Sequence, residues 1–392
     1  MTHSYPETIY KVISDRTRVP SWRGAVLPEE DSLQGRFLEE INAGARRMIR
    51  RYLKGCHGVH FYEGAQVADD GYVETIDGFL QEGEVLSLVE IVPVSTLFYE
   101  RFPYPSVPLK ALVHVAAAKA KVAGVDEVIL IVFDRNKSAW SAYEIEGDFD
   151  TALHRLPSLL VSPREPMDLR VRLASRITQA LDTYLYGLNA KKDPGHVRLP
   201  GIHPSEFSTS ECDRRIAYSI RGEEKRESTP PHLRRIFDVG HVFHDAIQGA
   251  LGEAFGDRFA AEVRIHNEGL KIVGSCDGQL DDDGFEVKSI NDNGHRKLRK
   301  EKPEHEKQGV LYAVHLQLKQ VNYLYANKES GEMSNFPVQV NRGLWQSMAA
   351  RAMRIVKAVD AGVMPDRIEN TRACEECPYG WTCRPGHGGF RR

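Results

Sequence analysis

Hydrophobic residues in the first half of the chain recur with helical spacing in some segments and with strand spacing in others. Helical periodicity fills segments 31–54, 109–123 and 168–188, the first of which has a basic end. Runs rich in β-branched and other apolar residues predict strands at 73–76, 86–92, 127–133 and 142–145. Helices and strands therefore alternate, which predicts a mixed α/β fold for this half.

The second half of the chain repeats a similar order of elements. We predict helices at 235–255, 304–318 and 343–362, and strands at 260–266, 270–280, 284–289, 320–326 and 335–340. Between the two sets, segment 189–201 is polar and contains the prolines and glycines typical of a linker. We therefore place a boundary near residue 195, between an N-terminal α/β domain (1–195) and a second domain (196–392).

A short internal match suggests that the two halves are copies of one unit. Segment 76–80 (IDGFL) matches segment 276–280 (CDGQL) at an offset of 200 residues. Each match precedes a glutamate in a predicted strand and then an Asn-Lys turn: Glu90 and Glu286, Asn136-Lys137 and Asn327-Lys328. The match is short and gapped, so duplication stays open. In a duplicated chain, Val92 would stand where Lys288 stands, and the first copy would be a degenerate, inactive one.

Composition narrows the class of protein. The chain has 392 residues, 41% hydrophobic and 27% charged, which fits a soluble globular protein of two domains. A net charge of -3 means that nucleic-acid binding would depend on local basic patches. No apolar run approaches the roughly 20 residues of a membrane span, and no signal peptide is visible, so we expect a cytoplasmic location without membrane contact.

The strongest chemical pattern is Asp277 followed by Glu286 and Lys288. Two strands joined by the acidic turn 281–284 would place the two carboxylates side by side. Strand periodicity puts Glu286 and Lys288 on one face and Val287 in the core. Carboxylates bind hard cations such as Mg²⁺, and a bound cation with a nearby amine suits phosphodiester hydrolysis. The alternative is an ordinary charged hairpin at the surface.

Residues on both sides of this pattern extend it. An upstream helix carries Gly240 and His244, and His244 could be a third metal ligand. A downstream helix carries Gln308 and Tyr312, which lie four residues apart on one helical face. The alternative for these two is that they are polar residues of the core.

Together these residues resemble the PD-(D/E)XK nuclease superfamily, in the branch of RecB-type nucleases and CRISPR-associated iron–sulfur exonucleases. The resemblance covers about residues 205–384. It implies a restriction-endonuclease-like mixed central sheet flanked by helices, and a site for Mg²⁺ or Mn²⁺. The metal ligands that it implies are His244, Asp277, Glu286 and the carbonyl of Val287. The catalytic residues that it implies are Asp277, Glu286, Lys288, Gln308 and Tyr312.

The cysteines form a second pattern. Cys374, Cys377 and Cys383 have the spacing C-x2-C-x5-C, at which thiolates can chelate one centre, and Cys212 is the candidate fourth ligand. The resemblance implies a 4Fe–4S cluster that joins the two ends of the nuclease domain. Structural Zn²⁺ is the alternative, and unliganded thiols are a further one. Cys276 is expected to be a core residue, and Cys56 has no partner pattern.

Basic residues predict where nucleic acid would bind. The run 295–300 lies between the Glu-x-Lys strand and the Gln308 helix, and two arginines follow Cys212. The candidate phosphate-binding residues are Arg214, Arg215, Arg296, Lys297, Arg299 and Lys300. Phosphate contacts carry no base preference, so little sequence specificity is expected. The alternative for the run is a solvated loop.

These patterns predict a metal-dependent DNA exonuclease that acts on ends or single strands in recombination, repair or phage DNA processing. No P-loop motif is present, so unwinding would need a helicase or recombinase partner. The alternatives are a structure-specific endonuclease and a non-catalytic iron–sulfur DNA-binding module.

Overall fold

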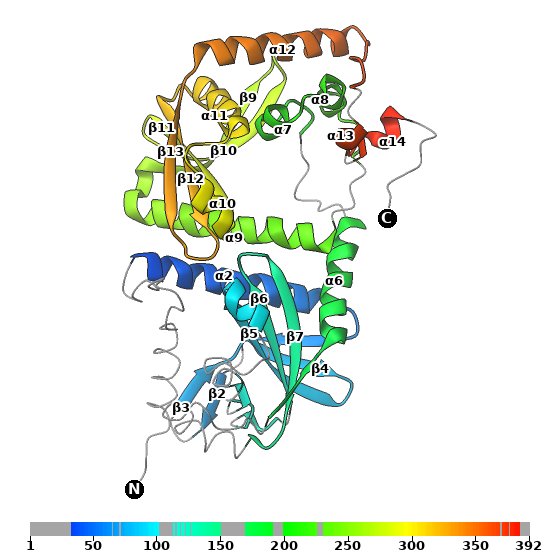
Figure 1. Cartoon of the computed structure of the whole chain (residues 1–392), viewed down its shortest axis with the longest axis vertical. Helices are drawn as coiled ribbons and strands as arrows, with labels where there is room; N and C mark the ends of the chain where they lie inside the picture. The colour runs from blue at the N-terminus through cyan, green and yellow to red at the C-terminus, as the bar shows by residue number, and fades with distance from the viewer. Residues whose placement is uncertain are drawn as a thin grey trace.

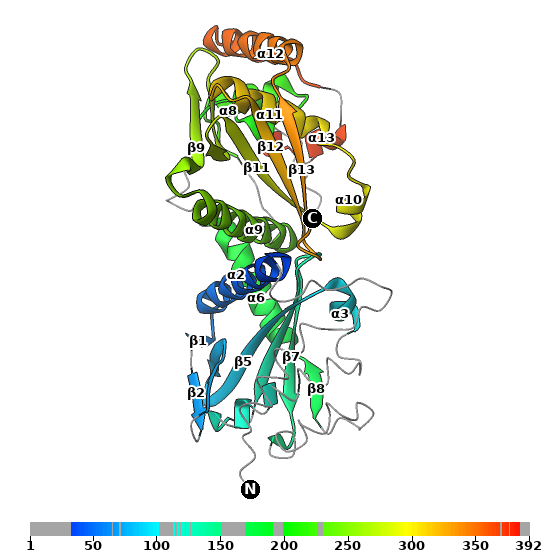
Figure 2. The same cartoon turned by 90° about the vertical axis from the view of Figure 1, so that its left-hand side faces the viewer.

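The computed structural model contains two large β-sheets, one in each half of the chain, and two long helices between them; a small two-stranded sheet lies in the N-terminal half (Figure 1). It describes residues 33–384, except for 65, 70–71, 102–112, 114–115, 118, 122, 126, 150–168, 191–198, 226–229, 369–370 and 376. The two helices are α2 (Leu33–Gly55) and α9 (Pro231–Phe255). They lie side by side in both views (Figure 2).

The N-terminal sheet has the strand order β1-β4-β5-β6-β7-β8. Its strands are β1 (His60–Glu63), β4 (Gly78–Glu82), β5 (Val85–Val94), β6 (Val128–Asp134), β7 (Ala139–Glu146) and β8 (Arg170–Leu173). Only β5 and β6 are parallel neighbours. Every residue of β6 is buried, which its apolar sequence explains. The other elements of this half are β2 (Gln66–Asp69), β3 (Tyr72–Thr75), α3 (Thr96–Arg101) and α6 (Ser175–Ala190).

The C-terminal sheet has the order β13-β12-β11-β10-β9, and only β11 and β12 are parallel. Its strands are β9 (Phe259–Asn267), β10 (Ile272–Leu280), β11 (Asp283–Ile290), β12 (Gln320–Asn327) and β13 (Met333–Gln339). Helix α9 packs on one face. The other face packs against α7 (Pro204–Thr209), α8 (Asp213–Ile220), α11 (Pro303–His315) and α12 (Arg342–Asp360). The short helix α10 (Asp292–Lys297) follows β11.

Strands β1-β4-β5-β6-β7 have the same order and the same relative directions as β9-β10-β11-β12-β13. One hydrogen bond fixes the correspondence of residues. Asp77 Oδ2 accepts from the Ile91 N–H at 2.8 Å, and Asp277 Oδ2 accepts from the Val287 N–H at 2.8 Å. Glu90 and Val92 therefore stand where Glu286 and Lys288 stand.

The predicted correspondence of the two Asn-Lys turns is wrong by two residues. Ile91 pairs with Ile131 and Val287 pairs with Leu324, so the counterpart of Asn327 is Asp134 and not Asn136. Asp134 and Asn327 also make the same kind of hydrogen bond. Each side chain accepts backbone N–H bonds from the turn that follows its strand.

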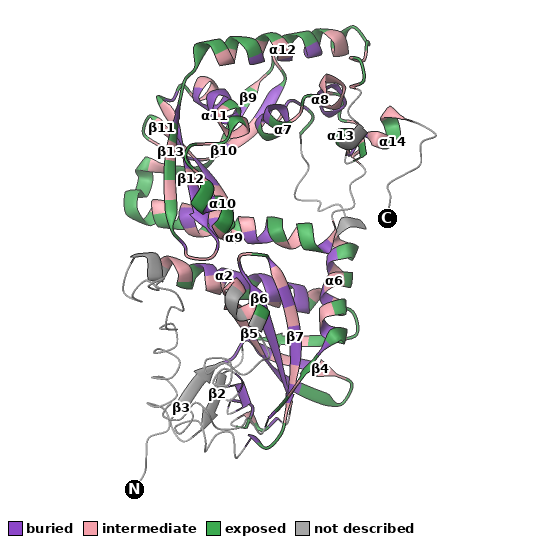
Figure 3. Ribbon diagram, viewed as in Figure 1, coloured by how far each residue is buried: buried purple, intermediate pink, exposed green. Residues whose placement is uncertain are grey.

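One hydrophobic core extends across both halves. Ile41 and Ile49 of α2 pack in the same cluster as Val239 and Phe243 of α9. Inner strands such as β6 and β12 are largely buried, whereas the edge strands β1, β8, β9 and β13 are mostly exposed or half-buried (Figure 3). The predicted boundary near residue 195 lies outside the described residues. The two halves are thus joined by packing between α2 and α9.

Most predicted elements are confirmed within a few residues, but the helix predicted over 168–188 is wrong at its start. Residues Arg170–Leu173 form β8, and the helix begins only at Ser175. The strand is stabilised at the sheet edge because Arg172 reaches acidic residues of β7, with Arg172 Nη2 4.0 Å from Glu144 Oε2. The sequence patterns did not predict β1, β2, β4, β8, α3, α7, α8 or α10, nor the short helices α13 (Thr371–Glu375) and α14 (Gly380–Cys383). The helix predicted over 109–123 falls mostly outside the described residues.

None of the helices in the described part of the chain combines the length and apolar character that crossing a bilayer requires.

Candidate active site

Two carboxylates meet where β10 and β11 pair. The Asp277 side chain accepts the Val287 N–H, and the Asp277 N–H donates to Glu286 Oε1 at 3.4 Å. Glu286 is 1% exposed, whereas Asp277 is partly open. The hairpin thus holds one buried and one accessible carboxylate next to each other.

Lys288 and Gln308 both bind Glu286. Lys288 Nζ lies 2.7 Å from Glu286 Oε2, and Gln308 Nε2 donates to the same oxygen at 3.2 Å. The Gln308 amide also donates to the Tyr312 hydroxyl at 3.4 Å, one turn along α11. Helix α11 therefore positions the Glu286 carboxylate from behind, while Val287 points into the opposite core.

Burial sets the charge state of this cluster. Desolvation raises the pKa of Glu286 to about 7, even though Lys288 opposes the rise. Burial also disfavours the Lys288 cation, but Glu286 and Asp277 together keep the pKa of Lys288 above its usual value. Near neutral pH, Glu286 can therefore gain or lose a proton while Lys288 stays charged.

His244 approaches the cluster from α9. Its Nδ1 lies 3.4 Å from Asp277 Oδ2, and burial lowers the pKa of the imidazole despite this neighbour. A neutral imidazole is the form that binds metals. Within the described residues, no three His, Cys, Asp or Glu side chains are grouped closely enough to hold a metal on their own. Asp277 and Glu286 still suit Mg²⁺, which usually keeps several waters and takes one or two carboxylates.

A cleft of about 800 Å³ opens onto His244, Val287 and Lys288. Most of the polar residues along it are basic. Its charged and titratable lining consists of Arg51, Arg234, Asp238, His241, His244, Lys288, Lys302, His305 and Lys328. Asp238 is the single acid among these lining residues. The cleft therefore suits an anion.

His305 lies in this cleft as part of an aromatic stack. Its ring is parallel to the Tyr323 ring at 5.2 Å, and its Nδ1 is 2.5 Å from the Tyr325 hydroxyl. Burial lowers the pKa of His305 to about 3, so it is neutral at ordinary pH. His305 belongs to the wall of the cleft. Among the described residues, it makes no hydrogen bond or ion pair with Asp277 or Glu286.

The structure separates the predicted DNA-binding residues from the cleft. Arg296, Lys297, Arg299 and Lys300 are exposed on α10 and the loop after it, and none of them lines the cleft. Arg214 and Arg215 lie instead beside the cysteines. Arg215 Nε bonds the buried Glu206 carboxylate at 3.0 Å, and Arg214 Nε donates to the Pro365 carbonyl.

Two basic residues that line the cleft, Arg51 and Lys328, were not among those expected to bind phosphate. Lys302 follows the predicted basic run by two residues, and Lys328 lies in the Asn-Lys turn, so both positions carry a signal in the sequence. Arg51 comes from α2, at the far end of the chain. It reaches the cleft only because α2 packs on α9, which no local pattern reveals.

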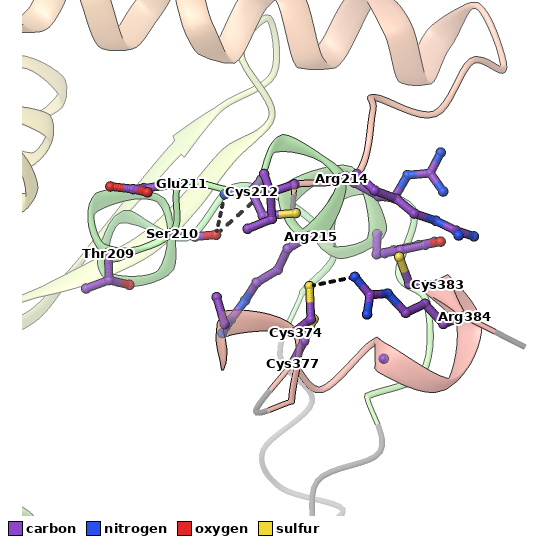
Figure 4. A pocket seen from close by; sticks show the side chains of 15 residues that line it. Thr209, Ser210, Glu211, Cys212, Arg214, Arg215, Cys374, Cys377, Cys383 and Arg384 are labelled. Atoms are coloured by element: carbon purple, nitrogen blue, oxygen red, sulfur yellow. Dashed lines mark hydrogen bonds between the residues drawn. The ribbon is translucent and has the colours of Figure 1, made fainter. Parts of the chain in front are cut away.

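The four predicted cysteine ligands line one cavity of about 500 Å³ (Figure 4). Cys212 precedes α8, while the other three come from α13 (Thr371–Glu375), α14 (Gly380–Cys383) and the turn between them. Burial raises the pKa of Cys377, and the nearby Cys212 and Cys383 thiols raise it further. All six cysteines are free thiols. Segments 160 residues apart therefore meet at this cavity.

The other two cysteines are core residues. Cys276 is fully buried and its S–H donates to the Phe285 carbonyl at 3.2 Å; burial raises its pKa to about 12. Cys56 is buried and donates to the Tyr52 carbonyl, with its pKa raised by burial to about 11. Neither thiol is placed for reaction.

Comparison with known proteins identifies no family. No protein-family model matches the sequence, and no curated protein matches it. Among solved structures, SSO0001 is 15% identical and has a TM-score of 0.35, over 52% of this chain and 95% of its own. An alkaline exonuclease (LHK-Exo) from Laribacter hongkongensis is 14% identical and has a TM-score of 0.35, over 42% of this chain and 90% of its own. The same enzyme in complex with dAMP gives the same values.

Proposed function

We propose that the chain is a metal-dependent nuclease that hydrolyses phosphodiester bonds in DNA. One observation carries the proposal: Asp277, Glu286, Lys288 and Gln308 form a hydrogen-bonded cluster at the edge of a basic cleft, with Glu286 and Gln308 buried and the other two partly exposed. Two adjacent carboxylates, one of them buried, are costly unless a cation offsets their charge, so an ordinary charged hairpin does not explain this pair. Its chemistry suits a cation on the carboxylates and a phosphate above it.

Each residue then has a distinct role. Asp277 and Glu286 would hold Mg²⁺ or Mn²⁺, with His244 and the Val287 carbonyl completing the ligand set. A bound cation would polarise the phosphate and lower the pKa of its water. Lys288 would stabilise the charge that develops on the phosphate oxygens. Gln308 and Tyr312 would fix the orientation of Glu286.

We assign a structural role to the cysteine cavity. Four thiols around one cavity, contributed by both ends of the C-terminal half, support a 4Fe–4S cluster held by Cys212, Cys374, Cys377 and Cys383. Such a cluster would cross-link α8 to the C-terminal segment and stabilise the fold. Structural Zn²⁺ uses the same ligands, and metal analysis of anaerobically purified protein distinguishes the two.

The N-terminal half, residues 1–195, is proposed to be a degenerate copy of the nuclease domain at 196–392. Three basic side chains contact the groups that correspond to the proposed metal ligands of the C-terminal half. Lys119 Nζ lies 3.0 Å from Glu90 Oε1, and Arg50 Nε lies 3.8 Å from Asp77 Oδ1. Arg46 Nε donates at 3.0 Å to the Ile91 carbonyl, which corresponds to that of Val287. Fixed cations would thus replace the divalent ion in this half.

The finer activity that we propose is exonucleolytic, with little base preference, in recombination, repair or phage DNA processing. Because the sequence has no P-loop, a helicase or recombinase would supply single strands. The test uses purified full-length protein with Mn²⁺ or Mg²⁺ and end-labelled linear DNA, beside covalently closed circles. Degradation of linear DNA alone is expected. Cutting of circles would indicate an endonuclease, and DNA binding without any cleavage would contradict the proposal.

A further inference from the structure

Lys328 is a buried cation in the lining of the cleft. It lies in the turn between β12 and β13, where its backbone N–H donates to the Ile290 carbonyl at 2.9 Å. The residue is only 6% exposed, yet it lines the cleft. Its side chain has no ion-pair or hydrogen-bond partner in the described part of the chain.

The acids closest in sequence are engaged elsewhere. The Glu329 carboxylate accepts the Thr96 N–H at 3.3 Å, from the N-terminal half. The Asp292 carboxylate accepts from the Asn327 amide at 3.0 Å and pairs with Arg296. Burial lowers the pKa of Lys328, and no neighbouring carboxylate offsets the cost. A buried cation without a counter-charge is destabilising, so an anionic ligand bound in the cleft would stabilise this position.

The surroundings of Lys328 point to the same ligand. The lining contributes Arg51 from α2, and Lys302 from the loop before α11. The one lining acid, Asp238, accepts from the Tyr52 hydroxyl and from Arg234 Nε, and its Oδ2 lies 3.9 Å from Arg51 Nη2. The single carboxylate of the lining is therefore already engaged by the protein's own groups, and the cations of the lining outnumber it.

We propose that Lys328 is a phosphate-anchoring residue, which binds a backbone phosphate of the nucleic-acid strand next to the one that is cut at Lys288. This inference rests on the proposed nuclease function and deepens it. Both lysines line one cleft, so a single polyanionic strand can occupy both. Arg51 would add a contact from the N-terminal half, which gives that half a role in holding substrate.

The test compares Lys328→Met with wild type and with Lys319→Met. Methionine keeps the length of the side chain and removes the charge. Lys319 is exposed, pairs with Asp282 at 2.8 Å, and lies at the opposite end of β12, about 30 Å away for nine residues at the rise of a strand. Affinity for a fluorescent single-stranded DNA oligonucleotide is measured in Ca²⁺ at several salt concentrations, beside thermal unfolding without DNA.

For Lys328→Met we expect about tenfold weaker binding, and a salt dependence of log Kd that is shallower by about 0.7, as for one lost phosphate contact. The melting temperature should stay or rise, because an unpaired buried charge is gone. Lys319→Met should change neither. Unchanged affinity and salt slope in Lys328→Met would overturn the inference even if wild type cleaves DNA. Binding that depends on Lys328 without cleavage would instead contradict the proposed function alone.

Discussion

Lys288 Nζ lies 2.7 Å from Glu286 Oε2, and the two residues are neighbours on one face of β11. The amine lines the cleft, whereas the carboxylate is buried behind it and is also held by Gln308. The pair thus connects the surface that would meet substrate to the group that would hold a cation. This geometry gives Lys288 and Glu286 different expected phenotypes.

Replacing Lys288 with Met should reduce DNA cleavage about 100-fold, as the loss of one transition-state contact typically does. Lysine is not a metal ligand, so Mn²⁺ should still bind with similar affinity. Cleavage rates on end-labelled DNA and calorimetric Mn²⁺ titration measure the two effects. Loss of Mn²⁺ binding together with activity would show that Lys288 acts structurally.

Replacing Gln308 with Leu should reduce kcat about tenfold and leave KM for DNA unchanged. The substitution removes the amide that orients Glu286 Oε2, and Gln308 does not line the cleft. Steady-state kinetics on one oligonucleotide check this split. A raised KM with normal kcat would place Gln308 in DNA contact instead.

The pKa of Glu286 makes the stability of the metal-free protein depend on pH. The carboxyl has a pKa of about 7 in the folded chain, against 4.5 for its ordinary value. The folded state therefore binds this proton more tightly, and its contribution to stability is complete below about pH 4.5 and lost as pH rises through about 7.

In EDTA at pH 8, Glu286→Gln should therefore melt higher than wild type, by about 2 to 4 °C for each kcal/mol gained. At pH 5 the difference should shrink, because wild type is protonated there. Thermal scans across this range measure it. A variant that is less stable than wild type at pH 8 would contradict a net cost of burying the Glu286 charge beside Lys288.

Cys374→Ser should lower both the metal content and the stability of the C-terminal half. Cys56→Ser is the control, since Cys56 is a buried thiol that does not line the cysteine cavity. Iron and zinc analysis with the visible absorbance spectrum measures the metal. Equal metal content in wild type and Cys374→Ser would remove the proposed ligand role.

Local patterns predicted the centre of the site but not its surroundings. Strand periodicity placed Glu286 and Lys288 on one face, and helix periodicity placed Gln308 above Tyr312, because each pair lies within a single element. Arg51 and Lys328 could not be placed in this way. Their positions depend on how α2 docks on α9 and how the β12–β13 turn meets the first half, which are long-range contacts.

The proposed repeat shows a similar limit of local patterns. The sequence matched Asp77 to Asp277 and Glu90 to Glu286, but it could not show that Lys119, from a separate helix, approaches Glu90. Residues Arg170–Leu173, at the start of segment 168–188, were predicted to be helical because their pairing with β7 cannot be seen in a short window of sequence. Tertiary pairing overrides local propensity at such an edge.

The central claim is that one active site exists, and that it lies in the C-terminal half. The most direct measurement compares Asp277→Asn with Asp77→Asn, since both aspartates accept the same backbone hydrogen bond in their own sheets. Cleavage of end-labelled single-stranded DNA in Mn²⁺ should fall about 100-fold or more in Asp277→Asn and stay near wild type in Asp77→Asn. Equal losses in both variants, or full activity in Asp277→Asn, would contradict the account.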